Sequence, residues 1–421
     1  MNNIVVALDI GSAFVRALIC ERDEKGALKI MGASAKPSTG LRKGVVVNIE
    51  ATLHSVTEAI EDAEMMAGLQ VEECWVGIGG NHINGLNSRG NVGITQKKRD
   101  SKEREISQED IDRVIEAAKA VVIPTDRQIL KVIPQNYNVD GQKGIRNPLD
   151  MLGIRLECEV HIITCAVTGG QNLIKCVNRA GFRVNELILK TLAAGRAVIT
   201  QEEMDLGVVL IDLGAGTTDV LVYVDGTPYS TYTIPAGGTQ VTGDISIIKN
   251  ISLDNAEKIK IDAGCCWEAF LEDDEDVIVP GVGGRAPMKI PRSHILDIIK
   301  PRMEELFKMV NQHLDTLNLQ RHLGGGVVLT GGGAQLHGVV ELANNILRLP
   351  ARLGTPIPTK DLEGLAEEYR TPAYATVVGL ALEGAGSPYF DAQINHGSRQ
   401  TENKGPALID KFKAWLKEEF F

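Results

Sequence analysis

Two short turns, each an aspartate followed by small residues, carry the residue types of this sequence best suited to chemistry. Each follows a short apolar strand, expected over residues 4–8 and 208–212, and together they contain Asp9, Gly11, Ser12, Asp212, Gly214, Ala215, Gly216 and Thr217. Glycines permit a tight turn whose amide N–H groups face one point, which suits a phosphate. A neighbouring carboxylate suits a hydrated Mg²⁺ ion, which keeps most of its water ligands. Two such turns facing each other would hold the β- and γ-phosphates of a nucleotide from both sides.

A third turn of small residues, Gly331-Gly332-Gly333, follows another apolar strand, expected over residues 327–329. Taken singly, the first turn is also typical of an ordinary hairpin, and the third is also typical of a strand packed against a helix. All three turns occur in order on strands of the same kind. This arrangement favours one nucleotide site assembled from the three turns.

The elements expected around these turns repeat in two halves. Residues 15–20 return as the hairpin partner of the first strand, and residues 53–67 have the apolar spacing of a helix. Residues 220–224 are the matching hairpin strand of the second half, and a largely helical block follows over residues 239–323. The pattern predicts an α/β protein with two related lobes.

Residues 83–160 interrupt the first half and predict an inserted subdomain. They contain a charged helix over 108–121 and a strand over 129–133 that ends at Pro134. The expected units are 1–82 with 161–200 for the first lobe, 83–160 for the insertion, 201–238 with 324–384 for the second lobe, 239–323 for a helical subdomain, 385–405 for a flexible linker and 406–421 for a terminal helix.

Composition limits the classes of function. The formal net charge of −11 argues against general nucleic-acid binding, which needs a basic surface. The seven cysteines form no C-x-x-C pair, and their odd number favours inert thiols in a reducing compartment. The N-terminus lacks the pattern of a signal peptide, and no stretch approaches the roughly 18 apolar residues of a membrane span. We therefore expect a cytoplasmic protein.

The terminal segment 406–421, called here the tail helix, has the pattern of an amphipathic helix at a membrane surface. Its apolar residues fall within about 140° of a helical wheel at about 100° per residue, with lysines on the other side. They are Leu408, Ile409, Phe412, Trp415, Leu416 and Phe420. The alternative is a helix that packs on the protein's own core. The polar linker before it favours a detached helix that binds lipid weakly alone and strongly when many copies act together.

The three turns together resemble the two phosphate loops and the adenosine loop of the superfamily of actin, sugar kinases and DnaK-type chaperones. Residues 371–380 resemble its second connecting helix, and Glu257 with Lys260 resembles the E-x-x-K pair that contacts adenosine. By itself that pair is also typical of a surface ion pair. The resemblance implies an actin-like (ribonuclease H-like) two-lobed fold that binds ATP and Mg²⁺, with Asp9 and Asp212 holding the metal through water.

The insertion resembles the one particular to the FtsA family of bacterial cell-division proteins. The resemblance is carried within the insertion by the segments 104–107, 129–137, 139–142, 147–157 and 159–164. Outside the insertion it is carried by 234–238, which includes Gly237 and Gly238, and by 242–245. It implies binding of ATP, self-association into filaments, and recruitment of FtsZ, through its C-terminal tail, to the cytoplasmic face of the membrane at the division septum. It assigns FtsZ binding to residues 239–323 and the membrane contact to the tail helix, and it allows further division-protein partners.

Three positions depart from the family pattern. Ala215 replaces a glycine of the second phosphate loop, which requires a negative φ there. Asp150 replaces a commonly found glycine in the insertion, and Lys190 occupies a position where relatives have neutral or acidic residues. The cleft then offers no evident group to orient an attacking water, so we expect firm ATP binding and at most slow hydrolysis.

Two other functions share the two-lobed fold. One is an ATP-dependent phosphotransferase of the sugar-kinase type, for which no acceptor-activating base is evident in the sequence. The other is a membrane-associated pilus-assembly scaffold related to FtsA, for which the insertion matches less closely.

Overall fold

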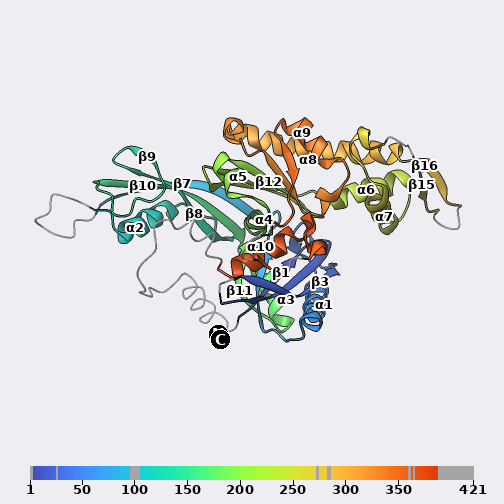
Figure 1. Cartoon of the computed structure of the whole chain (residues 1–421), viewed down its shortest axis with the longest axis horizontal. Helices are drawn as coiled ribbons and strands as arrows, with labels where there is room; N and C mark the ends of the chain where they lie inside the picture. Colours follow the sequence, from blue (N-terminus) through green and yellow to red (C-terminus); the bar gives the residue numbers. More distant parts are fainter. Residues whose placement is uncertain are drawn as a thin grey trace, which may run out of the picture.

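The computed structural model describes residues 3–24, 27–94, 105–271, 275–281, 286–358, 362–363 and 366–386. It is elongated, with the inserted subdomain at one end, the helical subdomain at the other, and the sheets of the two lobes between them (Figure 1). The tail helix and all but the first two residues of the expected linker lie outside the described residues. In the described part of the chain, no helix is both long and apolar enough to cross a bilayer.

The first lobe is built on a six-stranded sheet of order β11-β6-β1-β2-β3-β19. Its strands are β1 (Ile4–Ile10), β2 (Phe14–Arg22), β3 (Leu28–Pro37), β6 (Glu73–Ile78), β11 (Arg183–Leu189) and β19 (Leu362–Glu363). Side chains alternate between its faces along β1: Leu8 packs on the side of α1 (Ile49–Ala67) and α3 (Val167–Arg179). Ala7 packs on the side of α4 (Lys190–Val198) and α10 (Ala375–Gly384). Both faces are buried, which explains the continuous apolar run of β1.

The second lobe repeats this plan with a five-stranded sheet of order β14-β13-β12-β17-β18. Its strands are β12 (Val208–Leu213), β13 (Thr218–Val224), β14 (Thr227–Ile234), β17 (Val327–Thr330) and β18 (Ala351–Leu353). Leu210 and Val328 face α4 and α10 in the same core as Ala7. These two helices therefore lie between the sheets of both lobes (Figure 1). Gly379 allows their closest approach, because a Cβ there would lie 1.7 Å from the Ala193 carbonyl oxygen.

The insertion is a four-stranded antiparallel sheet of order β7-β10-β8-β9 with one helix packed on it. Its elements are β7 (Ile83–Gly93), α2 (Gln108–Lys119), β8 (Arg127–Val139), β9 (Gln142–Ile145) and β10 (Arg155–Ala166). The strand expected to end at Pro134 continues through it, so that boundary was wrong. The ladder shifts register where β10 passes Pro134, and such irregularities accommodate a residue that has no N–H to donate.

The helical subdomain contains α6 (Gly238–Lys249), α7 (Leu253–Ala263) and α8 (Ser293–Leu317), together with a β-hairpin that the sequence pattern did not predict. The hairpin pairs β15 (Asp276–Val279) with β16 (Met288–Pro291). The remaining elements are β4 (Leu41–Arg42), β5 (Val45–Val46), α5 (Gln201–Leu206), α9 (Val339–Leu347), η1 (Glu268–Phe270), η2 (Gln320–His322), η3 (Gly332–Gln335), η4 (Glu367–Tyr369) and η5 (Pro372–Tyr374).

Candidate functional site

The first turn joins β1 to β2 and places Asp9 near the carboxyl end of a buried strand. The Gly11 amide donates to the Phe14 carbonyl oxygen over 2.9 Å, which closes the turn. A Cβ on Gly11 would lie only 2.7 Å from that same oxygen, so the turn requires glycine. The Ser12 hydroxyl accepts a hydrogen bond from the Gly44 amide at 3.2 Å.

The second turn joins β12 to β13 and places Asp212 at the corresponding position. Asp212 pairs in register with Asp219 on the neighbouring strand. Both oxygens of the Asp219 carboxylate are occupied, one by the Thr217 hydroxyl at 2.7 Å and the other by the Thr233 hydroxyl at 2.6 Å. Ala215 has a negative φ, as its methyl group requires, so the alanine is accommodated in this turn.

The two turns come from different lobes and meet each other. A Cβ on Gly216 would lie 2.7 Å from Ser12 Oγ and 3.1 Å from the Lys43 backbone nitrogen. Lys43 and Gly44 form the tight turn of the β4–β5 hairpin, with φ of 52° and 76°. This hairpin was not predicted from the sequence, because Lys43-Gly44 is not one of the residue pairs that mark a two-residue hairpin turn.

The region where the two turns meet, called here the cleft, contains the aspartates in buried positions. Asp9 and Asp212 are 7% and 9% exposed. Burial, and then the nearby charges of Asp219 and Asp9, raise the pKa of Asp212 to about 7. The Thr376 hydroxyl, from α10, donates to Asp212 at 3.3 Å. The cleft therefore concentrates negative charge that a cation would relieve.

Lys190, the first residue of α4, supplies positive charge to this cleft. Its ammonium lies 2.8 Å from Asp9 Oδ1 and donates a hydrogen bond of 2.6 Å to the Ile10 carbonyl oxygen. The ammonium is well directed toward Ile10 but not toward the carboxylate, so Asp9 Oδ1 is buried without a well-directed hydrogen bond. The ion pair with Asp9 thus leaves that oxygen available to another ligand.

Residues at the start of α6 and on α7 contact the second turn. The Gly238 amide donates to the Gly214 carbonyl oxygen at 3.0 Å, and a Cβ on Gly237 would lie 2.4 Å from that oxygen. The Lys260 ammonium lies 2.7 Å from Glu257 and donates to the Gly238 carbonyl oxygen at 3.3 Å. The Glu257–Lys260 pair therefore lies beside the second turn. An ordinary surface ion pair would have no such contact with the turn.

The third glycine turn approaches the same aspartate. Gly331 has a φ of 82°, and a Cβ there would lie 2.2 Å from Asp212 Oδ1. A Cβ on Gly333 would lie 2.8 Å from the Leu213 carbonyl oxygen, whereas the space above Gly332 is open. The structure thus places the three predicted turns and the Glu257–Lys260 pair next to one another. The predicted membrane residues belong to the tail helix, outside the described residues.

Among the described residues, the protein side chains of the cleft do not form a group that could coordinate a metal ion directly. Within the described ranges, no group of three or more histidine, cysteine, aspartate or glutamate residues is arranged to hold a metal ion. Two carboxylates beside glycine turns instead suit Mg²⁺ that is held mainly by waters and phosphate oxygens.

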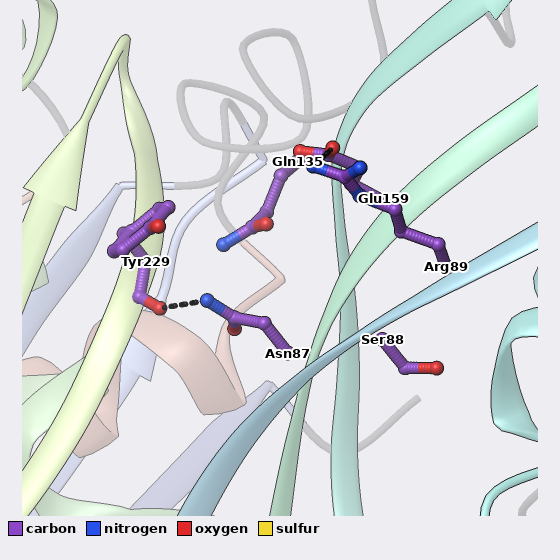
Figure 2. A pocket seen from close by; sticks show the side chains of 6 residues that line it. All are labelled: Asn87, Ser88, Arg89, Gln135, Glu159 and Tyr229. Atoms are coloured by element: carbon purple, nitrogen blue, oxygen red, sulfur yellow. Dashed lines mark hydrogen bonds and ion pairs between the residues drawn. The ribbon is translucent and has the colours of Figure 1, made fainter. Parts of the chain in front are cut away.

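A hollow of about 230 Å³, lined by other residues, lies between the insertion and β14 (Figure 2). It is lined by Asn87, Ser88, Arg89, Gln135, Glu159 and Tyr229. The Asn87 amide donates to the Tyr229 carbonyl oxygen at 3.0 Å across it, as the dashed line in Figure 2 marks. The Gln135 amide donates to the Pro228 carbonyl oxygen at 3.0 Å. These side chains attach the insertion to the second lobe.

Comparison with known proteins gives two family matches. The sequence profile described as "Cell division protein FtsA" matches residues 209–379. The profile described as "SHS2 domain inserted in FTSA" matches residues 80–164, which contain the expected insertion. A protein of Borreliella burgdorferi named "Cell division protein FtsA" is 42% identical over 421 residues, which cover 100% of both chains.

Solved structures show the same fold at low identity. The structure titled "PilM-PilN type IV pilus biogenesis complex" is 17% identical with a TM-score of 0.64, covering 90% of this chain and 98% of that one. MreB5 of Spiroplasma citri bound to ADP is 14% identical with a TM-score of 0.54, covering 94% of this chain and 99% of that one. The expected actin-like fold with an inserted subdomain is confirmed.

Proposed function

This chain belongs to the FtsA family of cell-division proteins, and from that premise we propose that it binds ATP between its lobes, self-associates into filaments and anchors FtsZ to the membrane. The place of action would be the cytoplasmic face of the division septum. The observation that carries the proposal is the meeting of Ser12 and Gly216, from different lobes, beside the buried Asp9 and Asp212.

The residues present fit ATP with Mg²⁺. Gly11 and Gly214 shape turns in which a side chain would collide with the backbone, and Gly332 faces open space. Asp9 Oδ1 lacks a well-directed hydrogen bond, as expected of an oxygen that receives a hydrated cation. Asp9 and Asp212 would hold the Mg²⁺ through water. The ADP-bound state of the Spiroplasma citri protein, which has the same fold, supports a nucleotide in this chain.

Glu257 and Lys260 would contact the adenosine. Lys260 is held by the Thr242 hydroxyl at 3.0 Å as well as by Glu257, so its ammonium has a fixed position beside the second turn. Contacts to adenosine from one lobe and to phosphate from both would make closure of the cleft depend on nucleotide. Bound ATP would supply a negatively charged link between the lobes.

Hydrolysis would be slow at most, because the carboxylates of the cleft would be engaged by the metal ion or by hydrogen bonds. Asp9 and Asp212 would serve the metal, and both oxygens of Asp219 accept threonine hydroxyls. No carboxylate among these three is then free to orient a water molecule for attack on the γ-phosphate. This supports a scaffolding role in which the bound nucleotide acts as a clamp.

FtsZ would bind the helical subdomain over residues 239–323. Four isoleucines there, on α6, α7 and β15, have mostly exposed side chains: Ile247, Ile248, Ile261 and Ile278 are 74%, 57%, 67% and 62% exposed. Large contiguous patches of exposed apolar side chains mark surfaces that bind a peptide or another subunit, whereas scattered ones are common on any protein. In the proposal, the four isoleucines would contribute to such a patch on this subdomain.

The tail helix would hold the filament on lipid. Its three acids balance its three lysines over 406–421, so burial of Phe412, Trp415 and its other apolar residues must supply most of the binding. Many helices on one filament would bind cooperatively where one helix binds weakly.

The proposal is tested by flotation of the protein with liposomes, with FtsZ and ATP present. We expect FtsZ to float only when this chain is added, and expect Trp415→Glu to abolish flotation of both proteins. Lys413→Gln is the matched control, since it also changes the charge by −1 but lies on the polar side of the helix. Flotation of FtsZ that is unchanged by Trp415→Glu would refute the membrane assignment.

A further inference from the structure

The side chain of Lys190 is fitted into the wall of the cleft rather than lying on its surface. A Cβ on Gly77 would lie 3.2 Å from Lys190 Cγ, and a Cβ on Gly79 would lie 3.2 Å from Lys190 Cδ. The two glycines at the end of β6 therefore leave room for the aliphatic part of the lysine. The side chain is 15% exposed, which is unusual for a lysine and requires partners for its charge.

The ammonium sits where the first phosphate turn begins. Its hydrogen bond to the Ile10 carbonyl oxygen fixes its position, and its contact with Asp9 is an ion pair without a well-directed hydrogen bond. Lys190 is also the cation, among the described residues, whose charge lowers the pKa of both Asp212 and Asp219. One lysine thus partly neutralises three carboxylates from both lobes.

Lys190 lies on the first-lobe side of the cleft, opposite the residues proposed for adenosine. Glu257 and Lys260 belong to α7 of the second lobe, whereas Lys190 follows β11 of the first-lobe sheet. A nucleoside triphosphate held by adenosine on the second lobe would extend its terminal phosphate toward the first lobe. The end of the triphosphate farthest from the base would then reach Lys190.

We infer that Lys190 recognises the terminal phosphate of a nucleoside triphosphate, exchanging its contact with Asp9 for a phosphate oxygen while Asp9 turns to the hydrated metal ion. This inference rests on the proposed binding of ATP. It names the residue by which the cleft distinguishes a triphosphate from a diphosphate. A lysine ammonium stabilises phosphate charge but cannot accept a proton from water, so the same residue favours holding the nucleotide over hydrolysing it.

The test is calorimetric titration of the full chain with ATP and with ADP, both in the presence of Mg²⁺. Lys190→Met retains the apolar stem over Gly77 and Gly79 but removes the charge. Because a charged hydrogen bond is lost only with the triphosphate, the ratio of ATP to ADP affinity should fall at least about tenfold. Lys260→Met is the matched control, since it should weaken both nucleotides alike and leave the ratio unchanged.

A second substitution keeps the test decisive if Lys190→Met fails to fold. Lys190→Gln can still donate to the Ile10 carbonyl oxygen, and it should lower the same affinity ratio. An unchanged ratio in a folded variant that still binds ATP would overturn the inference and leave the proposed function standing. A wild-type chain that binds neither nucleotide would overturn the proposed function, and the inference with it.

Discussion

His161 joins the inserted subdomain to the second lobe, and its replacement should remove a defined part of the protein's acid sensitivity. The ring is 1% exposed and lies between Asn87 Oδ1, 2.6 Å from Nδ1, and Thr231 Oγ1, 2.9 Å from Nε2. The Asn87 amide group is engaged with Tyr229, so its oxygen faces the ring and accepts from Nδ1. The neutral ring then accepts a hydrogen bond from Thr231 at Nε2.

The magnitude follows from the pKa of this ring. Burial lowers the pKa of His161 from 6.5 to about 4. The folded state therefore binds fewer protons than the unfolded state between these values, so stability rises with pH there and is lost as the pH falls from above 6.5 to below about 4. Between about pH 7.5 and about pH 5, the loss due to His161 is about 2 kcal/mol.

The assay compares urea unfolding of the wild type and of His161→Gln at both pH values. Asp212, whose pKa is raised to about 7, acts in the opposite direction, so the wild-type pH dependence alone does not isolate the histidine. The difference between the two proteins does: the free energy of unfolding of the variant should fall by about 2 kcal/mol less than that of the wild type.

If His161→Gln showed the same loss as the wild type between the two pH values, His161 would not be a buried neutral ring. The assigned junction between the insertion and the second lobe would then be wrong.

Three further substitutions have outcomes set by local geometry. Gly379→Val should destabilise the protein by about 3 kcal/mol or more, seen as a lower Tm, because its Cβ would overlap the Ala193 carbonyl oxygen between the two central helices. Asp150→Val should cost about 1–2 kcal/mol of unfolding free energy in urea, because φ at this position is 63°. Gly216→Val should separate the phosphate turns at Ser12 and weaken ATP binding at least about tenfold by calorimetry, with little change in Tm.

Much of the fold could be predicted from local patterns. The apolar runs before Asp9 and Asp212 identified the two central strands. The helix expected from the family resemblance of residues 371–380 is α10, which begins at Ala375 and packs closely on α4. The unexpected elements have weaker local signals. Pro134 suggested a strand end because proline has no N–H to donate to a neighbouring strand. The structure accommodates it with a register shift between β8 and β10, which the local sequence does not reveal.

The candidate site was predictable in its turns and not in the contacts between them. The ion pair of Lys190 with Asp9 joins residues 180 positions or more apart, and it depends on Gly77 in β6 and on Gly79 just after that strand. The place of Lys43 beside Gly216 likewise depends on how a short hairpin packs across the cleft. Such contacts follow from tertiary packing, which spacing along the chain does not encode. The left-handed φ of Asp150 explains why glycine is the expected residue there.

The central claim is that ATP in the cleft controls assembly on a membrane, and electron microscopy on a lipid monolayer tests it most directly. The full chain, with and without ATP, would be compared with a chain that ends at residue 386. We predict filaments on the monolayer for the full chain with ATP, and none without ATP or without the tail. Equal filaments with and without ATP would contradict the account.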